Sequence, residues 1–166
     1  MEDLAKQLVS VLQERGMTVS TAESCTGGMI AQAITSVPGA SAVFEYGVVT
    51  YANRIKAQEL GVAGESLARY GAVSEQVAVE MAEGVRRRAP SSIGIAVTGI
   101  AGPGGGTAEK PVGTVFAAVS GDGFCRVTRL SLLEECGDDR RRIREATVKY
   151  SIMLALEEIN REQQVK

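Results

Sequence analysis

Histidine is absent from this sequence, and so is tryptophan. Without histidine, one chain cannot form a Ser-His-Asp triad, a Cys-His pair or a histidine-ligated metal site. Aromatic residues make up only 4% of the chain, which disfavours the stacking platforms that bind single-stranded nucleic acids. These absences exclude the histidine-dependent hydrolytic chemistries and direct attention to serine, cysteine and lysine.

Other scarce features bound the class of protein. The three cysteines, Cys25, Cys125 and Cys136, lack the spacing of metal ligands, so we expect reduced thiols, no metal and a cytoplasmic protein. No apolar run approaches the ~18 residues that span a bilayer, and the acidic start, Met-Glu-Asp-Leu, lacks the layout of a signal peptide. A net charge of −2 argues against a basic surface for nucleic acid. We therefore expect neither a membrane nor a nucleic-acid partner.

The apolar pattern alternates between strands and helices. The predicted strands span residues 17–22, 44–51, 93–98, 112–120 and 124–132. Helical periodicity occupies most of the intervening segments, and one long helix follows residue 139. Asp-Gly at residues 122–123 is a strong hairpin signal. We therefore predict that residues 1–166 form one three-layer α/β/α domain, with a mixed, mostly parallel sheet and a C-terminal antiparallel hairpin.

Residues 22–28 read Ala-Glu-Ser-Cys-Thr-Gly-Gly and place several reactive groups between a predicted strand and a predicted helix. Glycine lets a ligand approach the main chain closely, and a helix N-terminus favours an anion. Ser24 is therefore a candidate nucleophile or phosphate ligand. The alternative is that Ser24 or Thr26 only caps the helix, as such residues often do. This segment alone is compatible with both interpretations.

Two further polar segments follow predicted strands. Asn53 is typical of an N-cap, and the helix that it begins carries Lys56 on its first turn. Residues 99–107 contain five glycines directly after an apolar strand, at the strand end where α/β sheets usually bind ligands. We interpret this segment as a ligand loop rather than a surface linker. It is not a P-loop, because no Gly-Lys-Ser/Thr closes it.

Arginine is concentrated at two helix ends. Residues 86–88 are three arginines at the C-terminus of a predicted helix, where cations are favoured, so we interpret them as a solvated helix end. Residues 140–144 contain four arginines at the start of the last helix, where cations oppose the helix dipole. This placement indicates an anionic ligand or partner carboxylates. Surface pairing with neighbouring Asp and Glu side chains is the alternative.

A serine nucleophile without histidine needs another base, and lysine is the usual substitute. Lys56 can serve only if its amine is neutral near pH 7, and burial or a nearby cation such as Arg140 lowers a lysine pKa. Main-chain N–H groups near residues 26–28 would then stabilise the oxyanion, each contributing about 3 kcal/mol. Cys25 is the rival nucleophile, because a helix N-terminus can lower the pKa of a thiol.

Six motifs, spread over nearly the whole chain, carry a family resemblance. They are residues 22–28; residues 48–51 (Val-Val-Thr-Tyr) with Asn53 and Lys56; residues 71–74 (Gly-Ala-Val-Ser); residues 98–105 (Thr-Gly-Ile-Ala-Gly-Pro-Gly-Gly); residues 110–113 (Lys-Pro-Val-Gly); and Asp139, Arg140, Ile143 and Arg144. Together they resemble the CinA C-terminal domain family. We expect the chain to lack the larger N-terminal domain of full-length CinA proteins and therefore to be similar to the stand-alone form. One departure is Ala52, where the family often has serine.

The resemblance implies a nicotinamide-nucleotide amidase. Such an enzyme hydrolyses nicotinamide mononucleotide to nicotinate mononucleotide and ammonia, in pyridine nucleotide salvage, without a metal or other cofactor. We therefore expect a pyridine mononucleotide as the small-molecule partner, and a homo-oligomer. The family is also associated with DNA competence and damage, so a non-catalytic nucleotide-binding module is the alternative function.

The resemblance also implies roles for individual residues. Ser24 is implied as the nucleophile and Lys56 as its base, with Tyr51 as a proton relay or orienting group. The implied substrate-binding residues are Thr26, Gly27 and Gly28 at the oxyanion hole, Thr98, Gly99, Gly102 and Gly105 in the glycine-rich loop, and Arg140, which would meet the phosphate or tune Lys56.

Overall fold

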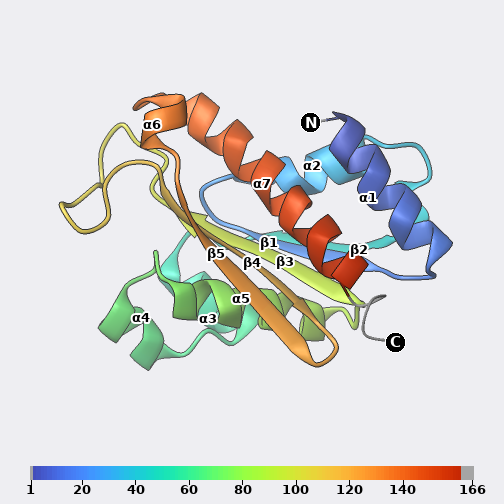
Figure 1. Ribbon diagram of the computed structural model, residues 1–166. Coiled ribbons are helices and arrows are strands. Elements are labelled where there is room, and N and C mark those ends of the chain that lie inside the picture. The colour runs from blue at the N-terminus through green and yellow to red at the C-terminus, as the bar shows by residue number, and fades with distance from the viewer. Residues whose placement is uncertain (1, 162–166) are drawn as a thin grey trace.

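A five-stranded sheet runs through the computed structural model, which describes residues 2–161 (Figure 1). The strands are β1 (Val19–Glu23), β2 (Phe44–Val49), β3 (Ile93–Gly99), β4 (Thr114–Gly121) and β5 (Phe124–Ser131). They lie in the order β2-β1-β3-β4-β5. β1 pairs in parallel with β2 and β3, whereas β4 is antiparallel to β3 and β5. Four strands therefore point one way, which confirms the predicted mixed, mostly parallel sheet and its C-terminal hairpin.

Helices cover both faces of the sheet and form the predicted three layers (Figure 1). One face carries α1 (Glu2–Glu14), α2 (Met29–Thr35) and α7 (Arg140–Arg161). The other face carries α3 (Asn53–Leu60), α4 (Gly64–Tyr70) and α5 (Glu75–Arg88). Two short helical turns, η1 (Ala40–Ala42) and α6 (Leu133–Cys136), lie in connections where the sequence pattern predicts no helix.

Burial is deepest in the central strands. Residues of β1 and β4 are buried throughout, as are those of β3 up to Thr98, whereas β2 and β5 have exposed positions along their length. One apolar cluster, which includes Leu8, Ile95 and Ile152, fills the α1, α2 and α7 side, and a second, which includes Met81 and Ala96, fills the α5 side. Because burying one large aliphatic side chain contributes about 1.5–3 kcal/mol, this core fixes the central strands and their ends firmly.

The N-cap of α5 agrees with the local sequence pattern, whereas that of α3 does not. Ser74 caps α5 by accepting a hydrogen bond from the Val77 N–H at 3.4 Å. Asn53 does not cap α3. Ala52 occupies the cap position in an extended conformation, without a side-chain hydrogen bond, and Asn53 is the first helical residue. The predicted Asn53 cap is therefore wrong, because the extended main chain ends one residue earlier than the sequence pattern indicates.

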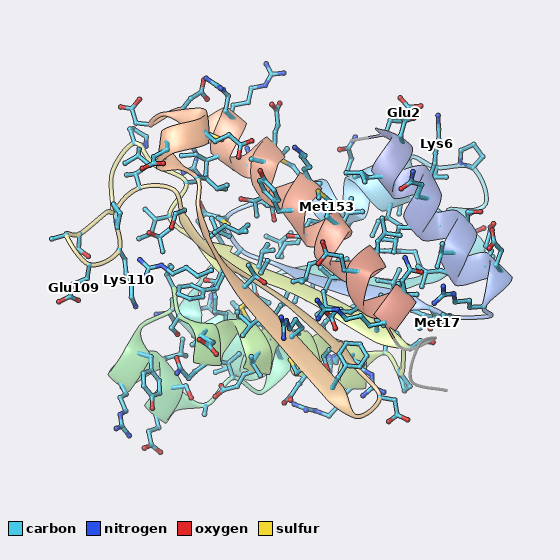
Figure 2. The ribbon with its side chains drawn as sticks, in the orientation of Figure 1. Glu2, Lys6, Met17, Glu109, Lys110 and Met153 are labelled. Carbon is cyan, nitrogen blue, oxygen red and sulfur yellow. The ribbon has the colours of Figure 1, made fainter. Side chains whose placement is uncertain are left out.

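The carboxyl ends of β1, β2 and β3 lie side by side, so the three polar segments start from one edge of the sheet. The Thr50 N–H donates to the Glu23 carbonyl at 2.8 Å, and the Ser24 N–H donates to the Val97 carbonyl at 3.1 Å. The loop between β3 and β4 extends beyond the sheet (Figure 1), and its outer part carries Glu109 and Lys110 (Figure 2).

Gly84 sets the distance between α5 and α3, the helix that carries Lys56. A Cβ at Gly84 would lie 2.1 Å from the carbonyl oxygen of Leu60, the last residue of α3. We expect Gly84→Ala to force the two helices apart and to lower the free energy of unfolding by more than about 1 kcal/mol, despite the higher helix propensity of alanine. Chemical denaturation measures this loss.

The matched control is Gly64→Ala, because a Cβ at Gly64 would meet nothing within 4 Å. Equal stabilities of the Gly84 and Gly64 variants would contradict the proposed close packing of α3 on α5.

Candidate active site

Ser24 and Lys56 meet at the carboxyl edge of the sheet. Ser24 directly follows β1, and Lys56 lies on the first turn of α3. The Lys56 Nζ lies 3.1 Å from the Ser24 Oγ. It also donates hydrogen bonds to the carbonyl oxygens of Thr50, at 2.6 Å, and Tyr51, at 3.4 Å. Ser24 is half-buried, whereas Lys56 is only 1% exposed.

Burial lowers the pKa of the Lys56 amine from its ordinary value of 10.5. Within residues 2–161, no salt bridge joins Lys56 to a carboxylate that would offset the lost hydration. Tuning of Lys56 is one of the two roles expected for Arg140, the other being contact with the phosphate. Arg140 contacts other groups, and burial is the cause of the lowered Lys56 pKa. The site therefore favours the neutral amine more than an exposed lysine would.

Cys25 has the opposite character. Its side chain is 5% exposed and belongs to the apolar cluster under α2 and α7. Burial raises the pKa of the Cys25 thiol to about 12. Because the thiolate is the nucleophilic form of cysteine, this environment keeps the thiol protonated and unreactive. The geometry therefore favours Ser24 over its rival.

Glu23 organises the turn after β1. It is 1% exposed, and its carboxylate accepts hydrogen bonds from the Thr26 hydroxyl and from three N–H groups at the start of α2, those of Gly28, Ile30 and Ala31. An anion at a helix N-terminus is stabilised by the helix dipole. The alternative in which Ser24 or Thr26 caps the helix is wrong, because the Thr26 hydroxyl donates to Glu23 and the longer Glu23 side chain takes the helical N–H groups.

The N–H groups of the turn are not equally available to a ligand. The Gly27 N–H donates to the Ser24 carbonyl at 3.1 Å, and the Gly28 N–H donates to Glu23 at 3.0 Å. The N–H groups of Cys25 and Thr26 have no acceptor within residues 2–161. Gly27 and Gly28 therefore do not fit the expected role of oxyanion donors, and the available donors are those of Cys25 and Thr26.

Arg140 connects two loops at this edge. It donates to the Gly102 carbonyl at 2.8 Å and to the Tyr51 hydroxyl at 3.1 Å. The Tyr51 side chain is exposed, so only the Tyr51 carbonyl, and not its hydroxyl, contacts Lys56. Arg141, by contrast, pairs with Glu145 on the surface at 2.7 Å. The arginine-rich helix start thus combines ordinary surface pairing with contacts to the site loops.

Arg144 is the residue whose position the sequence indicates least. It lies one helical turn after Arg140 and donates to the carbonyl oxygens of Cys25, at 3.1 Å, and Thr26, at 2.7 Å. The spacing of four between the two arginines was the available signal, because it places both on one face of α7. Glu23 was likewise visible as a carboxylate at a strand end, but nothing in the sequence assigned it a partner.

The predicted residues of the glycine-rich loop lie near the site in different ways. Thr98 is 1% exposed, and its hydroxyl donates to the Ala72 carbonyl at 2.7 Å, so it ties two loops together. A Cβ at Gly99 would lie 2.6 Å from a side-chain methyl group of β4. Gly102 and Gly105 have φ values of +76° and +85°, which L residues rarely adopt. These glycines shape the loop backbone, and Gly104 to Gly106 lie exposed on it.

Two structural features bear on other kinds of site. Along residues 2–161, no three Cys, Asp or Glu side chains are grouped as a metal site requires. None of the helices in this range is both long and apolar enough to cross a membrane.

The fold and the site together define an α/β protein that presents a serine hydroxyl and a buried lysine amine at the carboxyl edge of a mixed sheet. Residues 1–159 match the CinA C-terminal domain family. The chain belongs to this family.

Three relatives illustrate the match. The nicotinamide-nucleotide amidohydrolase PncC of Escherichia coli K12 is 48% identical over 153 residues, which cover 90% of this chain and 88% of that protein. A CinA-like protein of Parasynechococcus marenigrum is 49% identical over 160 residues, or 96% of this chain. The crystal structure of the competence/damage inducible protein CihA from Agrobacterium tumefaciens aligns with a TM-score of 0.90 and 44% identity, over 96% of this chain and 94% of that one.

The relatives differ in length. The match spans 37% of the Parasynechococcus protein and 36% of a CinA-like protein of Kosmotoga olearia, so this chain corresponds to a part of those longer proteins.

We expect Glu23→Gln to destabilise the protein. The amide nitrogen of glutamine is a donor and would face an N–H or hydroxyl donor, leaving a buried group without a partner. The free energy of unfolding should fall by about 1–3 kcal/mol in urea denaturation.

The matched control is Glu145→Gln, which removes a partly exposed i, i+4 ion pair on α7 and should cost less than about 0.5 kcal/mol. Equal stabilities of the two glutamine variants would show that the Glu23 contacts do not hold the turn.

Proposed function

We propose that this chain is an amidase that hydrolyses the carboxamide of nicotinamide mononucleotide, giving nicotinate mononucleotide and ammonia in pyridine nucleotide salvage. The observation that carries the proposal is the 3.1 Å contact between the Ser24 Oγ and the Lys56 Nζ. Burial lowers the pKa of this lysine. The amidohydrolase name of the Escherichia coli relative, which matches this chain over most of both lengths, supports the choice of substrate.

The hydrogen bonds around Lys56 suit a general base. A neutral amine has two N–H groups and one lone pair. The carbonyls of Thr50 and Tyr51 can accept the two N–H groups, which leaves the lone pair for the Ser24 hydroxyl. In this state the Ser24 O–H donates to Nζ, and the proton can pass to Lys56 as the oxygen attacks.

The proposed reaction has two halves. The Ser24 oxygen bonds to the carboxamide carbon, its proton moves to Lys56, and the former carbonyl oxygen becomes an oxyanion. When this intermediate collapses, the C–N bond breaks and Lys56 passes the proton to the departing amide nitrogen. Ammonia is released, and the acyl group remains bound to Ser24 as an ester. A water molecule, deprotonated by Lys56, then attacks the ester. The bond to the Ser24 oxygen breaks, Lys56 returns the proton to that oxygen and so restores the serine, and the released acid ionises to the carboxylate.

The surroundings of the pair offer groups for the rest of the substrate. The free N–H groups of Cys25 and Thr26 are the proposed oxyanion donors. We assign the nucleotide part to the glycine-rich loop and to Arg140, whose guanidinium has five N–H groups and is exposed beside Gly102 and the Tyr51 hydroxyl. Tyr51 would orient Arg140 rather than relay a proton, because its hydroxyl contacts Arg140 and not Lys56.

We expect Ser24→Ala to lower ammonia release from nicotinamide mononucleotide by on the order of 10³-fold or more, because the nucleophile is lost. Lys56→Met, which keeps the buried stem, should lower it by about 10²- to 10⁴-fold. Cys25→Ala keeps the main-chain N–H and removes only a protonated thiol, so it should retain most of the activity. A coupled ammonia assay measures all three.

Ser36→Ala and Lys149→Met are matched controls, because they make the same changes at exposed positions. Full activity of Ser24→Ala would exclude Ser24 as the nucleophile. Tight binding of the nucleotide by the wild type without any turnover would instead favour a non-catalytic binding module.

A further inference from the structure

Arg144 holds the turn that carries Ser24 from the side of α7. Its Nε donates to the Cys25 carbonyl at 3.1 Å and its Nη2 to the Thr26 carbonyl at 2.7 Å. A Cβ at Gly27 would lie 3.3 Å from the same Nη2, so the glycine lets the guanidinium approach the turn closely. The planar guanidinium therefore fixes two consecutive peptide groups at once.

These bonds also set the direction of the N–H groups. The C=O and N–H of a trans peptide point in opposite directions. Because the carbonyls of Cys25 and Thr26 point toward Arg144, the N–H groups of Thr26 and Gly27 point away from it. The Gly27 N–H reaches the main-chain carbonyl of Ser24 at 3.1 Å, so this direction leads toward the main chain of Ser24. By the same peptide geometry the Thr26 N–H points away from Arg144, and it has no acceptor within residues 2–161.

We propose that Arg144 is a positioning residue that aims the Thr26 N–H at the oxyanion formed when Ser24 attacks an amide carbonyl. This role rests on the proposed function of Ser24. A cation on the Cys25 carbonyl also polarises the peptide and makes the Thr26 N–H a stronger donor. The oxyanion exists only in the transition state and the intermediate, so loss of Arg144 lowers kcat more than it raises KM.

The test compares the wild type with Arg144→Gln, Arg144→Lys and Arg141→Gln by measuring kcat and KM for ammonia release from nicotinamide mononucleotide. Arg144→Gln lowers kcat by at least about tenfold, but by less than the roughly 10²- to 10³-fold cost of removing an oxyanion donor outright. Its KM changes by less than about threefold. Arg144→Lys recovers part of kcat, because lysine keeps the charge but lacks the planar fork.

Arg141→Gln is the matched control. Arg141 lies on the same helix, is exposed, and pairs with Glu145 rather than with the turn. It changes neither kcat nor KM.

Labelling of Ser24 by a small alkyl fluorophosphonate separates this role from the choice of substrate. The Ser24 oxygen bonds to phosphorus, fluoride leaves, and the hydroxyl proton passes to the base. The phosphoryl oxygen meets the same donors as an oxyanion would, so Arg144→Gln slows the labelling as it slows kcat. If wild-type Ser24 is labelled but no ammonia is released, the proposed substrate is wrong, and the labelling rates still decide the role of Arg144.

Equal kcat values and labelling rates in Arg144→Gln and Arg141→Gln would overturn the proposal. So would an effect confined to melting temperature or to KM, or a wild-type Ser24 that the reagent does not label. If circular dichroism shows that Arg144→Gln does not fold, Arg144→Lys gives the same comparison, and wild-type rates in that variant would then overturn the proposal.

Discussion

The buried amine of Lys56 is the constraint on which the site depends. An ammonium group that is only 1% exposed and has no carboxylate partner within residues 2–161 loses much of its hydration. The partners of the Lys56 Nζ are two main-chain carbonyls and one serine hydroxyl. A neutral amine can form a hydrogen bond with each of these three groups. The same burial that makes Lys56 costly for stability therefore makes it suitable as a base.

The rest of the structure holds Ser24 against this amine. Glu23 secures the turn from within by taking the first N–H groups of α2, and Arg144 secures it from α7 by taking two carbonyls. Arg140 connects the Tyr51 side chain to the glycine-rich loop at the same edge of the sheet, because it donates to both the Tyr51 hydroxyl and the Gly102 carbonyl. Elements from both ends of the chain thus converge on one turn, and α7 contributes to the site although it is distant in sequence.

Much of the fold could be predicted, because strand and helix periodicities agree with the buried faces that the structure shows. The proximity of Ser24 and Lys56 could be expected as well, since both follow neighbouring parallel strands. The Asn53 cap and the free donors of the turn could not, because they depend on single main-chain conformations. The contact between Arg144 and Cys25 joins residues 119 positions apart, and it follows from the packing of α7, which no local pattern specifies.

The pKa of Lys56 tests the central claim most directly. A carbon-13 NMR titration of labelled lysine Cε, with the Lys56 signal assigned by its loss in Lys56→Met, measures this pKa. The account predicts a midpoint below 10.5. At a pH between the lowered pKa of Lys56 in the native protein and its ordinary pKa in the unfolded chain, the native protein binds fewer protons than the unfolded chain. The Lys56 contribution to the free energy of unfolding therefore rises with pH in this range. A midpoint at or above 10.5 would contradict the account, because Lys56 would then be at least as protonated as an exposed lysine.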